Sequence, residues 1–232
     1  PTIKSSTTFK YDIPSYIKFE SKQLNEALDF IRNHRFELDG KGSIKLPKEL
    51  KSMKIDLGES KYQLGIGGIH STEHKQAIEP KDSEMLCDRD VASYYPAIIL
   101  NLRLYPRHLG ESFLDIYQAI VDERLKAKRS GDSLVNQSLK IVINGSFGKL
   151  GSKWSILYSP DLMMTVTMTG QLALLMLIER LELAGIKVVS ANTDGFVSIM
   201  DKSLYETYDD ICFQWELDTA FELEETKYKG LY

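Results

Sequence analysis

Apolar residues recur at helical spacing over several long stretches of the 232-residue chain. This spacing predicts amphipathic helices over residues 24–36, 111–129, 134–150 and 204–215. A further segment, 162–183, begins after a proline, and its run 172–178 is almost wholly apolar, which predicts a core helix. The two helices at 111–129 and 134–150 are joined by a short polar linker, and we therefore expect them to be antiparallel neighbours.

Short apolar runs bounded by turn residues predict strands between these helices. Asp194-Gly195 lies between two such runs, which indicates a hairpin with Asp194 at its tip. The runs are 62–70 (a glycine-rich strand), 85–87, 186–189, 196–200, 221–223 and 226–232. Helices and strands mixed in this order predict an α+β fold.

The composition indicates a chain that folds around a sizeable core. Apolar residues make up 43% of it, enough for one large domain or two subdomains. No apolar run approaches the roughly 18 residues needed to cross a bilayer, and no signal-peptide pattern opens the chain. The two cysteines suit a reducing cytosol and buried apolar positions. We expect the chain, with its start at Pro1 and its stop at Tyr232, to be a fragment.

Charge is strongly segregated along the chain, although the net charge is only −4. Residues 124–153 hold seven basic residues and one acidic residue. Residues 201–225 hold nine acidic residues and one lysine. A basic segment of this kind favours a local phosphate-binding site over a protein that coats nucleic acid along its whole surface.

Two acidic turns lie far apart in the sequence. Asp90 follows a short apolar strand, and Asp194 is at the tip of the predicted hairpin. Carboxylates at such strand ends can hold a hard divalent cation such as Mg²⁺. Solvated turn aspartates are the alternative for either residue taken alone.

The two predicted central helices carry polar residues on single faces. Arg124 and Lys128 are four residues apart on the first helix. Lys140, Asn144 and Phe147 share a face of the second. An ordinary amphipathic surface is the alternative, but glycines 145 and 148 are poor helix formers and suggest close approach of a ligand.

Three stretches, in order, resemble the motifs of the family B (alpha-like) DNA polymerases. The first motif, Asp-x-x-Ser-Leu-Tyr-Pro, is matched by Asp90, Ser93, Tyr95 and Pro96. The second, Lys-x-x-x-Asn-x-x-Tyr-Gly, is matched by Lys140, Asn144 and Gly148, with Phe147 in place of the tyrosine. The third, Tyr-x-Asp-Thr-Asp-Ser, is matched only by Thr193 and Asp194, and Asn192 replaces its first carboxylate.

The resemblance covers roughly residues 62–232 and implies a polymerase palm with an antiparallel sheet and a helical-hairpin fingers subdomain. On this basis we expect an N-terminal part and first palm segment over 1–110. The fingers would span 111–153, and the second palm segment, with the catalytic hairpin, 154–232. The resemblance implies a palm and fingers fragment of a polymerase of phage or prophage type.

The resemblance also assigns roles to single residues. It implies that Asp90 and Asp194 are catalytic and bridge two Mg²⁺ ions, or Mn²⁺, with the carbonyl of Val91 as a further ligand. Asp88 is an extra acid on the same strand face as Asp90. The implied nucleotide-binding residues are Ser93, Tyr94, Tyr95, Arg124, Lys128, Lys140, Asn144 and Phe147.

Tyr95 would form a floor beneath the incoming sugar. Because proline disfavours helix at the preceding residue, Pro96 predicts an extended backbone at Tyr95. Phe147 would offer a flat face to the new base pair.

DNA contacts are implied at Gly67, Gly68, Gly148, Lys227 and Lys229. The family segment Tyr-x-Gly-Gly approaches the template, and here Gly65 stands where its tyrosine would be. A sheet bulge is the alternative for the glycines, and surface strand lysines for Lys227 and Lys229.

Together these features predict a template-directed DNA polymerase that adds deoxynucleotides to a primer 3′ end. We expect primer-template DNA and deoxynucleoside triphosphates as partners, no membrane, a monomer, and a cytoplasmic location (a bacterial host's, if phage-encoded). The alternatives are another palm-type nucleotidyltransferase and, because of Asn192, a non-catalytic nucleic-acid-binding remnant. The fragment can be inactive alone.

Overall fold

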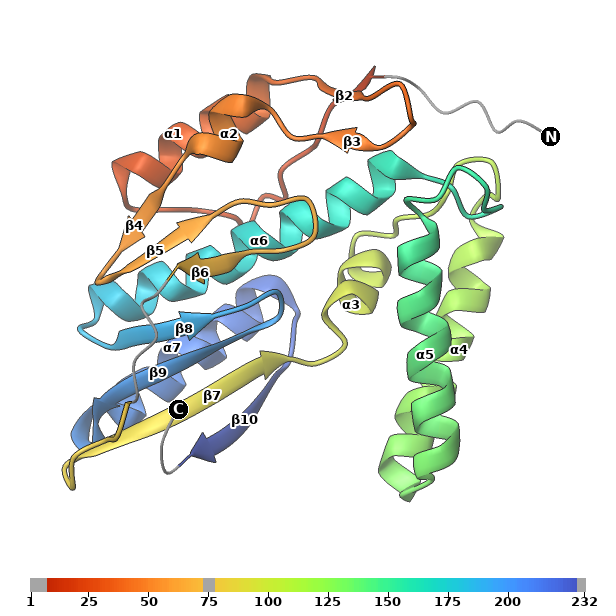
Figure 1. The fold of residues 1–232 in the computed structure, drawn as a ribbon. Coiled ribbons are helices and arrows are strands. Elements are labelled where there is room, and N and C mark those ends of the chain that lie inside the picture. The colour runs from red at the N-terminus through yellow and green to blue at the C-terminus, as the bar shows by residue number, and fades with distance from the viewer. Residues whose placement is uncertain (1–7, 73–77, 229–232) are drawn as a thin grey trace. The chain divides into compact units, whose positions relative to one another are not determined.

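The structure is a computed structural model that describes residues 8–72 and 78–228 (Figure 1). Over this part, the chain forms two compact units, each assembled from separate segments. The helical unit comprises residues 8–11, 35–45 and 95–166. The sheet unit comprises the described residues of 12–34, 46–94 and 167–228.

An antiparallel helical hairpin dominates the helical unit (Figure 1). Its helices are α4 (Ser112–Ser130) and α5 (Ser133–Lys149), as the sequence predicts to within two residues. Gly131 ends α4 with a φ of +76°, where glycine avoids the strain of a side chain. The Asp132 side chain then accepts from the Val135 amide at 3.1 Å and caps α5. A small antiparallel sheet completes the unit: β1 (Thr8–Phe9), β2 (Phe36–Leu38) and β3 (Ile44–Lys45).

A four-stranded antiparallel sheet forms the centre of the sheet unit. Its order is β10 (Leu223–Tyr228), β7 (Glu84–Val91), β9 (Gly195–Asp201) and β8 (Lys187–Ala191). The predicted hairpin is confirmed as β8 and β9. The middle strand β7 pairs with two strands that come much later in the chain. This long-range pairing, rather than local periodicity, fixes the end of β7 beside the start of β9.

Two helices pack into the core of this unit. These are the part of α6 (Pro160–Leu183) after Val166 and α7 (Tyr205–Thr219), which follows a short 3₁₀ turn, η1 (Lys202–Leu204). The buried Trp215 indole donates to the Ala173 carbonyl at 2.8 Å and joins the two helices. Contrary to the expectation from sequence, α6 is long and apolar enough to cross a membrane. However, 83% of that apolar window is buried, which is typical of a core helix.

The first part of the sheet unit combines two helices and a three-stranded sheet. Ser21 caps α1 (Lys22–Asn33) through the Leu24 amide. The sheet has the order β4 (Ile55–Leu57), β5 (Ser60–Gln63), β6 (His70–Thr72), and α2 (Lys48–Ser52) precedes it. The single strand predicted over 62–70 is wrong. Residues 64–69 form a loop between β5 and β6 because its three glycines do not sustain a strand.

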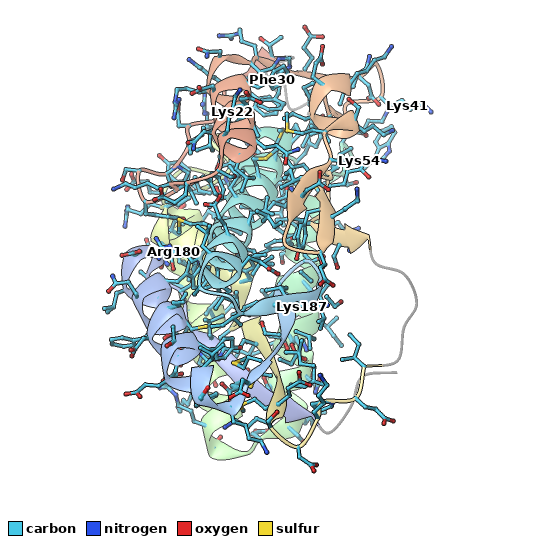
Figure 2. All side chains as sticks on the ribbon, turned by 90° about the vertical axis from the view of Figure 1, so that its left-hand side faces the viewer. Lys22, Phe30, Lys41, Lys54, Arg180 and Lys187 are labelled. Atoms are coloured by element: carbon cyan, nitrogen blue, oxygen red, sulfur yellow. The ribbon has the colours of Figure 1, made fainter. Side chains whose placement is uncertain are left out.

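Ion pairs tie these parts together at the surface of the sheet unit. Figure 2 labels Arg180 on α6, which lies 2.8 Å from the Asp218 carboxylate of α7. It also labels Lys187 of β8, which pairs with Glu59 in the turn between β4 and β5. Such exposed pairs contribute about 0–1 kcal/mol each, so the core carries most of the stability.

Candidate active site

The two predicted catalytic carboxylates meet at one edge of the central sheet. Asp90 lies near the end of β7, directly opposite Gly195, the first residue of β9. The Val91 amide donates to the Asp194 carbonyl at 2.7 Å and holds the two chain segments together. Both aspartates are accessible at this edge. The structure therefore brings together two carboxylates that lie 104 positions apart in the sequence.

Gly195 makes room for the Asp90 carboxylate. A Cβ atom at Gly195 would collide with Oδ1 of Asp90 and lie 3.0 Å from the Arg89 carbonyl oxygen. The requirement concerns space, since the φ of Gly195 is outside the left-handed region. Sequence reasoning used this glycine only as a turn signal and missed its role beside Asp90.

Asn192 orders the turn that carries Asp194. Its side-chain oxygen accepts from the amides of Asp194 (3.1 Å) and Gly195 (3.0 Å). The backbone amide of Asn192 donates to the Gly195 carbonyl at 2.9 Å. An amide oxygen performs this capping without adding a negative charge. The residue that departs from the family motif thus has a clear structural function here.

Negative charge accumulates on the face of the sheet that bears Asp90. Partial burial raises the pKa of Asp90 to about 6, and the nearby charges of Asp88, Asp194 and Glu224 contribute to this rise in that order. Strand alternation places Asp88, Asp90 and Glu224 on one face, with Glu224 directly opposite Asp90 across the β10–β7 pair. Sequence reasoning missed Glu224, because only strand register places it here. A divalent cation would relieve this repulsion.

The donor set fits a cation that completes its coordination with other ligands. Across residues 8–72 and 78–228, no group of three or more His, Cys, Asp or Glu side chains is arranged to hold a metal ion. Asp90, Asp194 and the Val91 carbonyl are all oxygen donors at one edge of the sheet. Mg²⁺ is commonly held by one or two carboxylates, with water and substrate phosphates as its remaining ligands. These residues fit that pattern.

Arg89 anchors the opposite face of β7. Its buried guanidinium pairs with Asp209 at 2.5 Å and Glu225 at 2.6 Å, and it stacks 4.7 Å above the Tyr208 ring. Because charged groups are costly to bury unless paired, this cluster fixes β7, β10 and α7 together. Lys227 lies on the same face, 3.5 Å from Glu225. Its DNA contact stays a prediction, on the face away from Asp90.

A second loop packs against the turn that carries Asp194. The buried Gln171 of α6 accepts from the Gly65 amide at 2.7 Å and donates to the Gly65 carbonyl at 2.9 Å. A Cβ at Gly68 would lie 2.6 Å from Thr193 Oγ1, so only glycine fits there. Beyond the loop, Ser71 Oγ accepts from the Ala191 amide at 2.8 Å, just before the turn.

These contacts give the glycine segment a structural role that the sequence did not reveal. Gly67 is exposed, and a Cβ atom added to it would meet nothing within 4 Å, whereas Gly68 is buried. The predicted DNA contacts at both glycines stay predictions. Lys229, the other predicted DNA contact beyond β10, lies outside the described residues.

The first motif continues from β7 into helix α3 (Tyr94–Asn101). Ser93 adopts a φ of +48°, a strained backbone for a residue with a side chain. The Tyr94 ring is buried in the sheet unit, where its hydroxyl donates to the Gly170 carbonyl at 2.6 Å. Nucleotide binding by Ser93 and Tyr94 stays a prediction.

Tyr95 lies in the first turn of α3, so the extended backbone expected there is wrong. Pro96 is tolerated because it too is in the first turn, where its missing amide hydrogen has no helical partner. Within the helical unit, the Tyr95 and Phe147 rings lie 4.4 Å apart between centroids, tilted by 38°. The first and second motifs thus contribute to a single aromatic pair.

The basic residues of the hairpin are accessible. Arg124 is half-buried on α4, while Lys128, Lys140 and Asn144 are exposed. On α5, added Cβ atoms at Gly145 and Gly148 would meet nothing within 4 Å. Protein packing therefore does not require either glycine, which leaves ligand approach as an explanation. The nucleotide and DNA roles of these residues stay predictions.

Comparison with known proteins shows distant and partial likeness to DNA polymerases. No family model matches the chain. Over 130 residues, 46% of the chain, the sequence is 29% identical to DNA polymerase II of Escherichia coli (strain K12), but this covers 17% of that protein. The family B DNA polymerase of the hyperthermophilic archaeon Pyrobaculum calidifontis matches 82% of this chain and 28% of its own. At 15% identity and a TM-score of 0.48, this structural likeness carries no argument about activity.

Proposed function

We propose that this chain carries the nucleotidyl-transfer centre of a template-directed DNA polymerase. The observation that carries the proposal is the meeting of Asp90 and Asp194 at one edge of the central sheet. The three ordered motifs and the partial likeness to DNA polymerase II support it. The substrates would be primer-template DNA and deoxynucleoside triphosphates.

The reaction is a phosphoryl transfer, in which positioning and charge neutralisation dominate catalysis. The primer 3′-oxygen forms a bond to the α-phosphorus of the nucleotide. The bond from that phosphorus to the oxygen bridging the β-phosphate breaks, and pyrophosphate leaves with the bonding electrons. The proton of the 3′-hydroxyl passes to solvent.

Asp90, Asp194 and the Val91 carbonyl would hold two divalent cations. When bound, such a pair of ions stabilises the charge on the attacking and leaving oxygens. Gly195 and Asn192 keep the two carboxylates in place, because the first leaves space for Asp90 and the second orders the turn of Asp194.

The helical unit supplies groups suited to a nucleotide. Arg124, Lys128 and Lys140 offer positive charge for the triphosphate, and charged hydrogen bonds to phosphate are stronger than neutral ones. The paired rings of Tyr95 and Phe147 offer flat apolar surface for the sugar and base. Asn144, one helical turn before Phe147, can line the same face.

Template-directed incorporation tests the function directly. Four primer-templates that differ only in the first templating base are each incubated with the chain, Mg²⁺ and one labelled deoxynucleotide at a time. The proposal predicts addition only of the complementary nucleotide and only with a divalent cation. Template-independent addition would indicate another nucleotidyltransferase. DNA binding without any addition, also in a longer protein that includes this chain, would indicate a non-catalytic remnant.

A further inference from the structure

The segment between α5 and α6, residues 150–159, is a compact loop that the proposed function leaves unexplained. Its ends meet, since the Ser159 amide donates to the Leu150 carbonyl at 2.9 Å. Inside it, the Ser155 amide donates to the Ser152 carbonyl at 2.9 Å, and the Tyr158 amide to the Ser155 carbonyl at 3.1 Å. Compact loops with closed ends frequently have functions.

Two side-chain hydrogen bonds, one made by the loop's own Tyr158 and one by His108, fix this loop to other parts of the helical unit. The Tyr158 hydroxyl donates to the Gly42 carbonyl at 2.6 Å. His108 Nε2 lies 2.6 Å from the Ile156 carbonyl oxygen, so this nitrogen carries the hydrogen that it donates. A loop held in one conformation loses little further freedom when a ligand binds, which favours affinity.

The loop presents an aromatic side chain to solvent. Trp154 is 87% exposed, whereas the chain's other tryptophan, Trp215, is fully buried. A large aromatic ring left exposed on a rigid loop is typical of a binding residue. Ile156, 69% exposed, adds apolar surface two residues away.

The sequence around Trp154 is positively charged. Residues 133–160 contain Lys140, Lys149 and Lys153 and no aspartate or glutamate. Lys153 Nζ lies 5.1 Å from the centre of the Trp154 ring. An aromatic ring can stack on a flat ring of a ligand, and the lysines beside it can pair with negative groups that link such rings.

We propose that Trp154 is a stacking platform for a base of single-stranded nucleic acid, with Lys149 and Lys153 beside the adjoining phosphates. Proteins that bind single strands combine stacking aromatics with basic side chains in this way. Only the identity of the strand, which would be unpaired template, rests on the proposed polymerase function. The binding itself needs neither nucleotide nor metal.

The two tryptophans make the test direct. The 232-residue chain is titrated with a deoxythymidine oligonucleotide of about 15 nucleotides in EDTA, and tryptophan emission is recorded. The exposed Trp154 emits at longer wavelength than the buried Trp215, so stacking should quench the long-wavelength part alone. Trp154→Ala should remove that part and weaken binding about tenfold. Lys153→Ala should lower the slope of log affinity against log salt by about 0.7.

Phe213→Ala is the matched control, because Phe213 is an exposed aromatic (58%) on α7 of the sheet unit. It should bind the oligonucleotide as the wild type does, and retained Trp215 emission verifies the fold of each variant. Oligonucleotide affinity unchanged by Trp154→Ala, or no binding at all, would overturn the inference, and the latter result would favour a protein partner for the loop. If quenching persists but no primer is extended, the inference stands and the polymerase function fails. If primers are extended and Trp154→Ala binds the oligonucleotide as tightly as the wild type, the polymerase function stands and the inference about Trp154 fails.

Discussion

At the scale of single residues, the candidate site depends on how closely the Asp90 carboxylate lies to the backbone of β9. Gly195 leaves the space that this carboxylate occupies. The sequence identifies Asp90 and Asp194 through their motifs, but it does not reveal the closeness of Gly195 or Glu224. Those depend on the pairing of strands that lie far apart in the chain.

Gly195→Ala should displace the Asp90 carboxylate into another rotamer, because the new methyl group would take its place. We expect primer extension to fall at least about tenfold, which corresponds to about 1.4 kcal/mol of lost transition-state stabilisation. The melting temperature should fall only modestly, because the Asp90 side chain can move aside, although the backbone carbonyl oxygen of Arg89 would lie 3.0 Å from the new methyl group. Gly40→Ala is the control, since an added Cβ there meets nothing within 4 Å. Equal activity in the two variants would show that the spacing at Gly195 is unimportant.

The raised pKa of Asp90 predicts a pH-dependent stability of the metal-free chain. Partial burial and neighbouring carboxylates raise this pKa from 3.8 to about 6. Between these two values the folded chain binds more protons than the unfolded chain. The free energy of unfolding should therefore fall as the pH rises through this window.

Asp90→Asn removes the negative charge that lowers the free energy of unfolding as the pH rises. In EDTA it should raise the melting temperature at about pH 8 and change it little at about pH 4.5, where Asp90 is already protonated. Asp210→Asn, at an exposed position on α7, provides the comparison. A gain of the same size at both pH values would mean that Asp90 is not under repulsion.

Tyr95→Ala tests the aromatic pair on the helical unit. Without the Tyr95 ring, which lies 4.4 Å from Phe147, the expected floor beneath the sugar is lost. The ratio of kcat/KM for deoxynucleotides to that for ribonucleotides should fall about tenfold or more, since rejection by collision is removed. Leu134→Ala, an exposed residue of α5, should leave the ratio unchanged. A mutant ratio equal to that of the wild type would place the selection elsewhere.

At the scale of elements, the helices and the hairpin that carries Asp194 follow from periodicity and turn chemistry. The bounds of α6 and the β8–β9 hairpin agree closely with the sequence pattern. The loop at 64–69 differs from the strand that the sequence pattern predicts. Its conformation is fixed by Gln171 of α6 and by contact with Thr193. The backbone of Tyr95 is helical and not extended as predicted. Proline generally disfavours helix at the residue before it, but the first turn of a helix tolerates Pro96. Both differences depend on context that the local sequence pattern does not contain.

Gln171→Met should loosen the loop that packs on the turn carrying Asp194. The variant keeps a similar volume but leaves the Gly65 amide and carbonyl without their partner. We expect a loss of about 1–3 kcal/mol in the free energy of unfolding, measured with urea. Extension should also fall under conditions in which the chain stays folded. Gln214→Met, at an exposed position on α7, should change neither the free energy of unfolding nor primer extension. Normal activity in a destabilised Gln171 variant would restrict the residue to stability alone.

At the scale of the whole molecule, the chain builds each unit from separate segments. The strand β7 and the hairpin β8–β9 both belong to the sheet unit, and the basic helices belong to the helical unit. Periodicity predicts such elements one at a time and contains no information on their pairing. The expected closeness of Asp90 and Asp194 came from the order of the motifs, and the register of β7 with β9 agrees with it.

The central claim is that Asp90 and Asp194 form one catalytic pair. The most direct measurement is single-turnover primer extension with Mg²⁺ by the wild type, Asp90→Asn, Asp194→Asn and the double variant, with Asp210→Asn as the control. The proposal predicts that each single variant loses at least about a thousandfold in rate and that the double variant loses little more, because residues acting as a unit are not additive. The control should extend normally. Extension that survives either single change, or losses that multiply in the double variant, would contradict the pairing.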